Sequence, residues 1–297
     1  MSGGWLLGFG LSVLRLSVPY VTAALGGTVC ERAGVINIAL EGFLLVAALG
    51  TALGAAHGAL AAVLCGLGAG LGLALLYGLL VVVFRGDQIV CGVAAFLLAD
   101  GLSRVLLKAV YGSTSNSPRL PALAGYGPAL PVLAMVLLVL LVHVALYGSV
   151  LGLRLRAVGE RPQAARALGV SVAAIRMYAV AISGLLTAVG GVYLVFEQRQ
   201  FVALMSGGRG FLALAAMIFG GWRPIYAALA ALLFAGAETL GIQLQASGLH
   251  IPNFLVQLLP YALTLVALLG RGALGRGQGR QGGIGSQAPA ALGQPRE

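Results

Sequence analysis

The chain has 297 residues, of which 60% are hydrophobic and only 9% are charged, and its mean hydropathy is +1.00. A soluble domain carries about 25% charged residues because its surface must be solvated. This composition therefore excludes a soluble enzyme, a nucleic-acid-binding domain and a disordered or collagenous chain. The net charge of +10 does not indicate nucleic acid, because nine arginines fall in two short segments that are typical of topology determinants. The chain is expected to be an integral membrane protein.

Apolar segments long enough to cross about 30 Å of hydrocarbon recur along the chain. The runs are too long and continuous for the roughly 10-residue alternating strands of a membrane barrel. We therefore expect an all-α, polytopic protein with about nine transmembrane helices, eight or ten being the alternatives. Residues 1–270 would form a single transmembrane domain, and 271–297 a disordered, basic tail. The expected spans are 5–29, 34–56, 59–83, 89–110, 128–148, 177–196, 210–222, 224–244 and 253–269.

The placement of arginines predicts the orientation in the membrane. Residues 149–176 contain five arginines against one acidic residue, and the tail contains four more. Both segments should be cytoplasmic, which requires an even number of crossings between them and puts the N-terminus outside. The segment 210–222 is short for a helix that spans a bilayer. Parity favours a short crossing there, or two half-elements that cross together.

The basic segment 149–176 also predicts a short helix. Pro162 suits the first turn of a helix, and Gly169 is a natural C-terminal stop. Small residues between them, Ala164 and Ala165, would allow close approach of a partner. The alternative is an ordinary positively charged loop on the cytoplasmic side.

Three blocks of sequence resemble the permease subunits of ATP-binding-cassette (ABC) importers, in particular the nucleoside and simple-sugar permeases related to the branched-chain amino-acid permeases. The blocks are ERAGVINIALEG (31–42), the pattern Gln163-Ala164-Ala165-x-x-x-Gly169, and GRGFLALAAMIFGGWRP (208–224). The second block resembles the E-A-A-x-x-x-G coupling motif, with Gln163 in place of glutamate, which removes one charge. The resemblance covers about residues 20–269. It implies that the coupling residues, which contact the ATPase, are Gly159, Glu160, Gln163, Ala164, Ala165, Leu168 and Gly169.

The resemblance also implies the function and the partners. The chain would be a multi-pass permease of the bacterial inner membrane that imports nucleosides by alternating access. Its partners would be a cytoplasmic ABC ATPase, a second homologous permease subunit, an external substrate-binding lipoprotein and the lipid bilayer. ATP and magnesium would be bound by the ATPase and no cofactor by this chain. The only lysine, Lys108, has no preceding glycine, so the chain has no phosphate-binding loop of its own.

Polar residues inside the spans are candidates for the substrate path, because ionisable groups in hydrocarbon usually face a cavity or a partner. Asn37 and Glu41 lie one helical turn apart between Gly34 and Gly42, which would permit a broken helix. They would contact substrate or, alternatively, brace the helix break. Glu238, near Gln243, is expected to be uncharged or paired and to touch the transport route. Asp100 and Arg104 are expected to neutralise each other.

Two alternative functions stay open at this point. Within the same class, the substrate would be a simple sugar or a branched-chain amino acid. In a different class, the chain would be an ion-coupled secondary transporter that works through Glu41 or Glu238 without a partner. No nucleophile–base pair or metal-binding cluster indicates an enzyme.

Overall fold

The structure, a computed structural model, describes residues 3–120, 129–246 and 288–294, and these residues are helical throughout apart from turns and connecting segments. Seven of the helices are long and apolar enough to cross a membrane, whereas α9 is shorter. The expected span 253–269 lies outside the described residues. The all-helical, polytopic fold is confirmed, and the total of nine crossings stays a prediction. The elements are α1 (Gly3–Arg32), α2 (Leu40–Gly54), η1 (Ala55–His57), α3 (Ala59–Gly78), η2 (Leu79–Val83), α4 (Gln88–Tyr111), α5 (Ala129–Gly148), α6 (Val150–Glu160), α7 (Pro162–Ala167), α8 (Val172–Gln198), α9 (Arg209–Phe219) and α10 (Pro224–Ala246).

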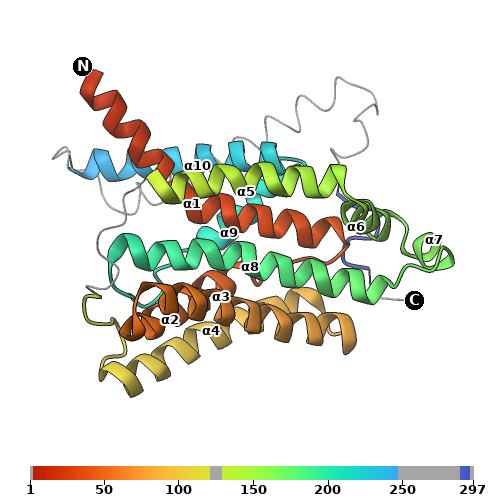
Figure 1. The fold of residues 1–297 in the computed structure, drawn as a ribbon, viewed down its shortest axis with the longest axis horizontal. Helices are drawn as coiled ribbons and strands as arrows, with labels where there is room; N and C mark the ends of the chain where they lie inside the picture. The colour runs from red at the N-terminus through yellow and green to blue at the C-terminus, as the bar shows by residue number, and fades with distance from the viewer. Residues whose placement is uncertain (1–2, 121–128, 247–287, 295–297) are drawn as a thin grey trace.

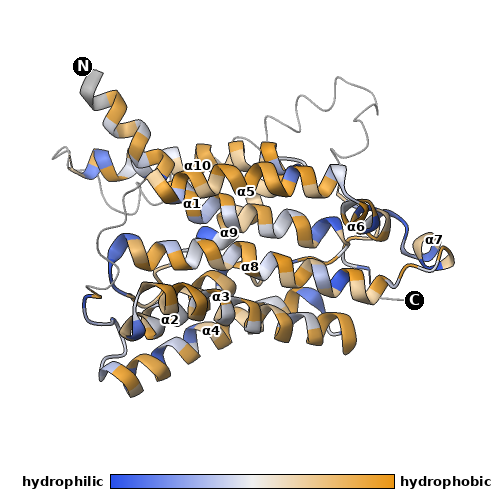
Figure 2. Ribbon diagram, in the orientation of Figure 1, coloured by the Kyte–Doolittle hydropathy of each residue, from blue (hydrophilic) through white to orange (hydrophobic). Residues whose placement is uncertain are grey.

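The long helices form a bundle in which some are enclosed and others face outward (Figure 1). The span that contains α2 is 83% buried and that of α8 is 72% buried, whereas those of α4 and α5 are 22% and 17% buried. The outward faces of α4 and α5 remain apolar (Figure 2). A face of this kind is compatible with lipid or with another membrane subunit, and not with water.

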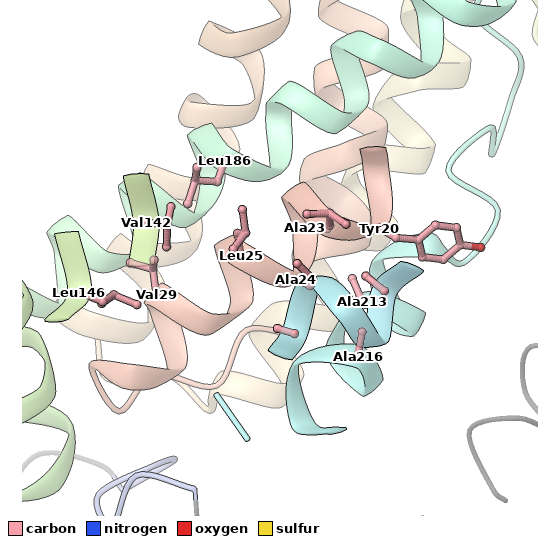
Figure 3. Packing of buried hydrophobic residues seen from close by; sticks show 14 of the residues in the cluster. Tyr20, Ala23, Ala24, Leu25, Val29, Val142, Leu146, Leu186, Ala213 and Ala216 are labelled. Carbon is pink, nitrogen blue, oxygen red and sulfur yellow. The ribbon is translucent and has the colours of Figure 1, made fainter. Parts of the chain in front are cut away.

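Glycines allow the inner helices to approach closely. A Cβ atom at Gly184 of α8 would lie 2.2 Å from the Cβ of Ala74 in α3. One at Gly191, also on α8, would lie 2.3 Å from the carbonyl oxygen of Leu44 in α2. Any side chain there would force the helices apart, so these two glycines serve helix packing. Small side chains also pack α1 against α9, where Ala24 of α1 lies near Ala213 of α9 (Figure 3).

The connection between α5 and α8 folds as expected from its sequence. The Ser149 hydroxyl accepts the N–H of Gly152 and caps α6, and Ser171 caps α8 in the same way. Between them, Pro162 begins α7 and Gly169 lies just beyond its end with a φ of 80°. The expected short helix is therefore confirmed. It projects from one end of the bundle (Figure 1), which we call the α7 end.

Two irregular segments interrupt the helices of the bundle. The segment 33–39 is irregular, so the expected span 34–56 begins as a helix only at Leu40. The second is 199–208, which precedes the short helix α9. Because α8 ends far from the α7 end and α10 begins at that end (Figure 1), residues 199–208 and α9 together connect opposite ends of the bundle. This is the arrangement of two half-elements that parity allows.

Part of the C-terminal tail is ordered. Residues 288–294 form turns against the α7 end, where the Ala291 N–H donates to the Gly159 carbonyl oxygen over 2.9 Å. The sequence assigned these residues to a disordered tail, whereas the structure holds them by hydrogen bonds to Gly159 and Gly34; the division into a membrane domain and a tail stays a prediction. Residues 271–287 lie outside the described part of the chain.

Candidate functional site

Asn37 stabilises the interruption before α2. Its Nδ2 donates to the Ser183 hydroxyl of α8 over 2.8 Å, and its Oδ1 accepts the N–H of Ala39 over 3.2 Å. The side chain is fully buried. A buried amide replaces hydrogen bonds that an unwound backbone would otherwise lack in an apolar interior. Asn37 therefore fixes the position of the break against α8.

Glu41 connects the two interrupted elements. Its carboxylate accepts the N–H of Gly208 over 2.8 Å and that of Gly210 over 2.7 Å, at the first turn of α9. The side chain is only 2% exposed. A negative charge at a helix N-terminus satisfies free N–H groups and complements the helix dipole. A Cβ atom at Gly210 would lie 2.4 Å from the Glu41 nitrogen, so glycine is required for this approach. Glu41 thus braces the break, as one of the two readings of the sequence expected.

Glu238 of α10 is paired. Its Oε1 lies 2.6 Å from Nη2 of Arg209, and its Oε2 accepts the Tyr20 hydroxyl over 2.8 Å. Arg209 also donates from Nη1 to the carbonyl oxygen of Met205. These bonds join α1, α9 and α10 at the N-terminus of α9. The sequence predicted a paired or uncharged Glu238 but did not identify Arg209 as the partner, because 29 residues separate them.

Gln243 lies five residues beyond Glu238 on α10 and is separate from these clusters. Its Oε1 is buried and has no hydrogen-bond partner among the described residues. The structure therefore brings Asn37, Glu41 and Glu238 together around the two interruptions, whereas Gln243 stands at their margin. The Glu238 side chain is 23% exposed and therefore accessible, whereas Asn37 and Glu41 are buried.

The coupling residues divide into an exposed and a buried set. Gln163, Ala164, Leu168 and Gly169 are exposed, and Leu168 is 85% exposed at the tip of the α7 end. Ala165 is only 4% exposed and belongs to the buried cluster beneath the helix. Ala165 therefore faces its own bundle, because a short helix must bury one face to remain folded, and its expected contact with the ATPase stays a prediction.

Gly159 and Glu160 mark the inner end of the coupling segment. Gly159 is buried, and a Cβ atom there would lie 2.1 Å from the Arg32 carbonyl oxygen at the end of α1. Glu160 is half-buried. The end of α6 therefore rests directly on the backbone that leads into the interruption before α2. The coupling segment and the broken helix are in contact.

Sequence reasoning missed a second cluster at this contact. Arg32 donates from Nε to the Trp222 carbonyl oxygen over 2.8 Å, and the Trp222 indole N–H donates to Glu31 over 2.7 Å. Trp222 is buried, with 8% of its surface exposed. These bonds fasten the α9–α10 turn to the end of α1. The adjacent charges Glu31 and Arg32, placed just before a glycine break, were the available signal.

Comparison with known proteins gives the family. The model of the family described as "Branched-chain amino acid transport system / permease component" matches residues 10–268. The chain is 35% identical to the guanosine ABC transporter permease protein NupQ of Bacillus subtilis, with 87% of this chain and 90% of NupQ covered. It is 32% identical to the nucleoside ABC transporter permease protein NupC of Lactococcus lactis, with 86% and 90% covered.

A more distant relative is the glucose ABC transporter permease protein TsgB13 of Haloferax volcanii, 29% identical, with 88% of this chain and 76% of TsgB13 covered. No solved protein structure matches the chain. Membership of this family implies an ATPase partner and a substrate-binding protein, and it places a multi-pass protein in the inner membrane. The chain belongs to the family of branched-chain amino acid transport system permease components.

Proposed function

We propose that this chain is the transmembrane permease subunit of an ABC importer for nucleosides. The relatives named as guanosine and nucleoside permeases, each at least 32% identical over most of both chains, support the substrate class. The observation that carries the role in the complex is the projecting helix α7 with Leu168 exposed at its end. An isolated apolar side chain on a basic, water-facing segment favours insertion into a partner's groove.

The α7 end would face the cytoplasm, with the N-terminus outside. The five arginines of 149–176 support this orientation, since basic segments are retained on the cytoplasmic side. A cytoplasmic ATPase would bind ATP and magnesium and contact α7. A second homologous permease would complete the membrane pathway, and an external lipoprotein would deliver the substrate. The apolar outward faces of α4 and α5 fit contact with lipid or with that second subunit.

The contacts suggest how motion would reach the substrate path. Movement of α7 would be passed through α6 to Gly159, which touches the Arg32 carbonyl oxygen. From there it would reach the interruption before α2, and through Glu41 the N-terminus of α9. Packed elements with two discrete arrangements transmit such shifts. Alternating access would follow from displacement of α2 and α9 against the rest of the bundle.

We place the substrate path along α10 at the N-terminus of α9. Glu238 is partly exposed there, and the side-chain carbonyl oxygen of Gln243 on the same helix has no hydrogen-bond partner within the described part of the chain. Asn37 and Glu41, which are buried and bonded, would shape this site from behind. Transporters use interrupted helices in this way, because the helix ends offer unpaired polar groups near the membrane centre.

The substitution Leu168→Glu tests the role of α7. A charge at the tip should abolish insertion into an apolar groove, so the ATPase should no longer co-purify with the permease. The matched control is Leu204→Glu. Leu204 is an exposed leucine in the segment 199–208, which precedes α9 and is not part of the coupling segment. This variant should retain the ATPase. Equal retention of the ATPase by both variants would contradict the proposed docking role.

A further inference from the structure

The end of the C-terminal tail bonds two parts of the α7 end at once. The Ala291 N–H donates to the Gly159 carbonyl oxygen over 2.9 Å, and the Gly293 N–H donates to the Gly34 carbonyl oxygen over 3.3 Å. In addition, the Ala290 N–H lies 3.4 Å from the Glu160 carboxylate. Gly159 is the second-last residue of α6, just before α7, and Gly34 lies at the start of the interruption 33–39 before α2. The segment 288–294 therefore spans the junction between the coupling segment and the broken helix.

The fit between the segment and its groove is close. Ala291 is 2% exposed, and a Cβ atom at Gly34 would lie 3.2 Å from the Ala291 carbonyl oxygen. Gly293 has a φ of 73°, and a Cβ atom there would lie 2.8 Å from Cδ1 of Ile36. Only small residues fit on both sides. Gly293 also forms one wall of a cavity of about 260 Å³ that is bounded by Arg176.

The packing contact between Gly159 and the Arg32 carbonyl oxygen resists compression more than it resists separation. Atoms in van der Waals contact resist being pushed together, but they resist separation only weakly. Movement of α6 toward the interruption would therefore be transmitted without the tail. Movement of α6 away from it is transmitted by bonds that hold the two parts together. The hydrogen bonds of Ala291 and Gly293 supply such bonds.

We propose that residues 288–294 are a positioning strap that makes the end of α6 and the loop at Gly34 move as one unit. The strap acts through these elements and does not touch the substrate. When α7 and α6 move away from the bundle, the strap would pull the segment before α2 with them. Each cycle of ATP hydrolysis would then return the substrate path to its starting conformation. This inference rests on the proposed function, and it adds to it a part of the chain beyond the membrane helices.

Ala291→Arg tests the strap, because a long charged side chain cannot occupy the buried position of Ala291. The matched control is Ala288→Arg at an exposed position of the same segment, and Ala291→Gly, which keeps the N–H, should behave as the parent. The measurement is substrate transported per ATP hydrolysed by the reconstituted complex. Losing two hydrogen bonds should reduce this ratio roughly tenfold in Ala291→Arg. ATPase retention and ATP hydrolysis should be unchanged.

A chain that ends after residue 287 removes the strap without adding a side chain, and it should show the same uncoupling. If transport per ATP equals that of the parent in both variants, or rises, the strap has no positioning role. A parent complex that hydrolyses ATP without any transport would overturn the proposed function, and the inference with it. Parent transport with unaffected variants would overturn only the inference.

Discussion

Glu41→Ala is the substitution that most severely tests the structural account of the two interruptions. It removes both acceptors for the N–H groups of Gly208 and Gly210. The Gly210 N–H is buried and the Gly208 N–H is partly buried, so both lose a hydrogen-bond partner that solvent replaces poorly. We expect the first turn of α9 to loosen and the contact between α2 and α9 to weaken.

The size of the effect follows from these two bonds. A hydrogen bond to a charged group contributes about 1.5–3 kcal/mol, and loss of a helix cap costs about 1 kcal/mol. The hydrogen bonds and the helix cap are the same contacts, so their contributions are not added. We therefore expect Glu41→Ala to lower the free energy of unfolding by about 3 kcal/mol. For a protein of this size, that corresponds to a decrease in Tm of roughly 6–12 °C. Glu41→Gln keeps one acceptor oxygen and should lose about half as much.

Thermal unfolding of the purified protein in detergent is the assay, with Glu197→Ala as the control. Glu197 is an exposed glutamate at the end of α8, bonded to the Tyr193 hydroxyl over 3.2 Å, and exposed pairs contribute little. Its Tm should stay near that of the parent. If Glu41→Ala unfolds at the same temperature as Glu197→Ala, then Glu41 does not brace α9, and the reasoning about the interruptions is refuted.

Two further predictions concern the ion pair and the orientation. Glu238→Gln leaves the largely buried Arg209 without its carboxylate partner and should lower both the Tm and transport. Adding Arg209→Gln to this variant should restore the Tm while transport stays impaired. If the two substitutions instead lower the Tm additively, the two side chains do not act as a pair. For the orientation, single cysteines at Ser171 and Ser115 in a chain without its natural cysteines should differ in intact cells. A membrane-impermeant thiol reagent should label the cysteine at Ser115 and spare the one at Ser171, and the reverse pattern would invert the topology.

Local features of the fold were predictable from the sequence. Helix α7 and its limits follow from Pro162 and Gly169, whose backbone preferences act within a few residues. The ion pair between Asp100 and Arg104, 3.1 Å apart, follows from their spacing of one helical turn. The glycine breaks around Asn37 likewise indicated an interrupted helix. In each case the partners are close in sequence, so the period of the helix alone brings them together.

Contacts between distant segments were not predictable in this way. Which residues lie opposite Glu238 depends on how α9 enters the bundle, so the sequence did not identify Arg209 as its partner. The orientation of Ala165 depends on which face of α7 packs on the bundle, and a six-residue helix has too few turns to show an apolar stripe. The docked segment 288–294 has a composition typical of linkers, and its binding groove is built from Gly34, Ile36 and Gly159.

The most direct test of the proposed function is uptake by proteoliposomes. They would contain this chain with its partner permease, its ATPase and its binding protein. We predict saturable uptake of labelled guanosine that requires ATP and the ATPase, that is reduced by unlabelled nucleosides, and that is unaffected by glucose or leucine. Uptake by this chain alone in response to an ion gradient, or ATP-driven uptake blocked by glucose or leucine and not by nucleosides, would contradict it.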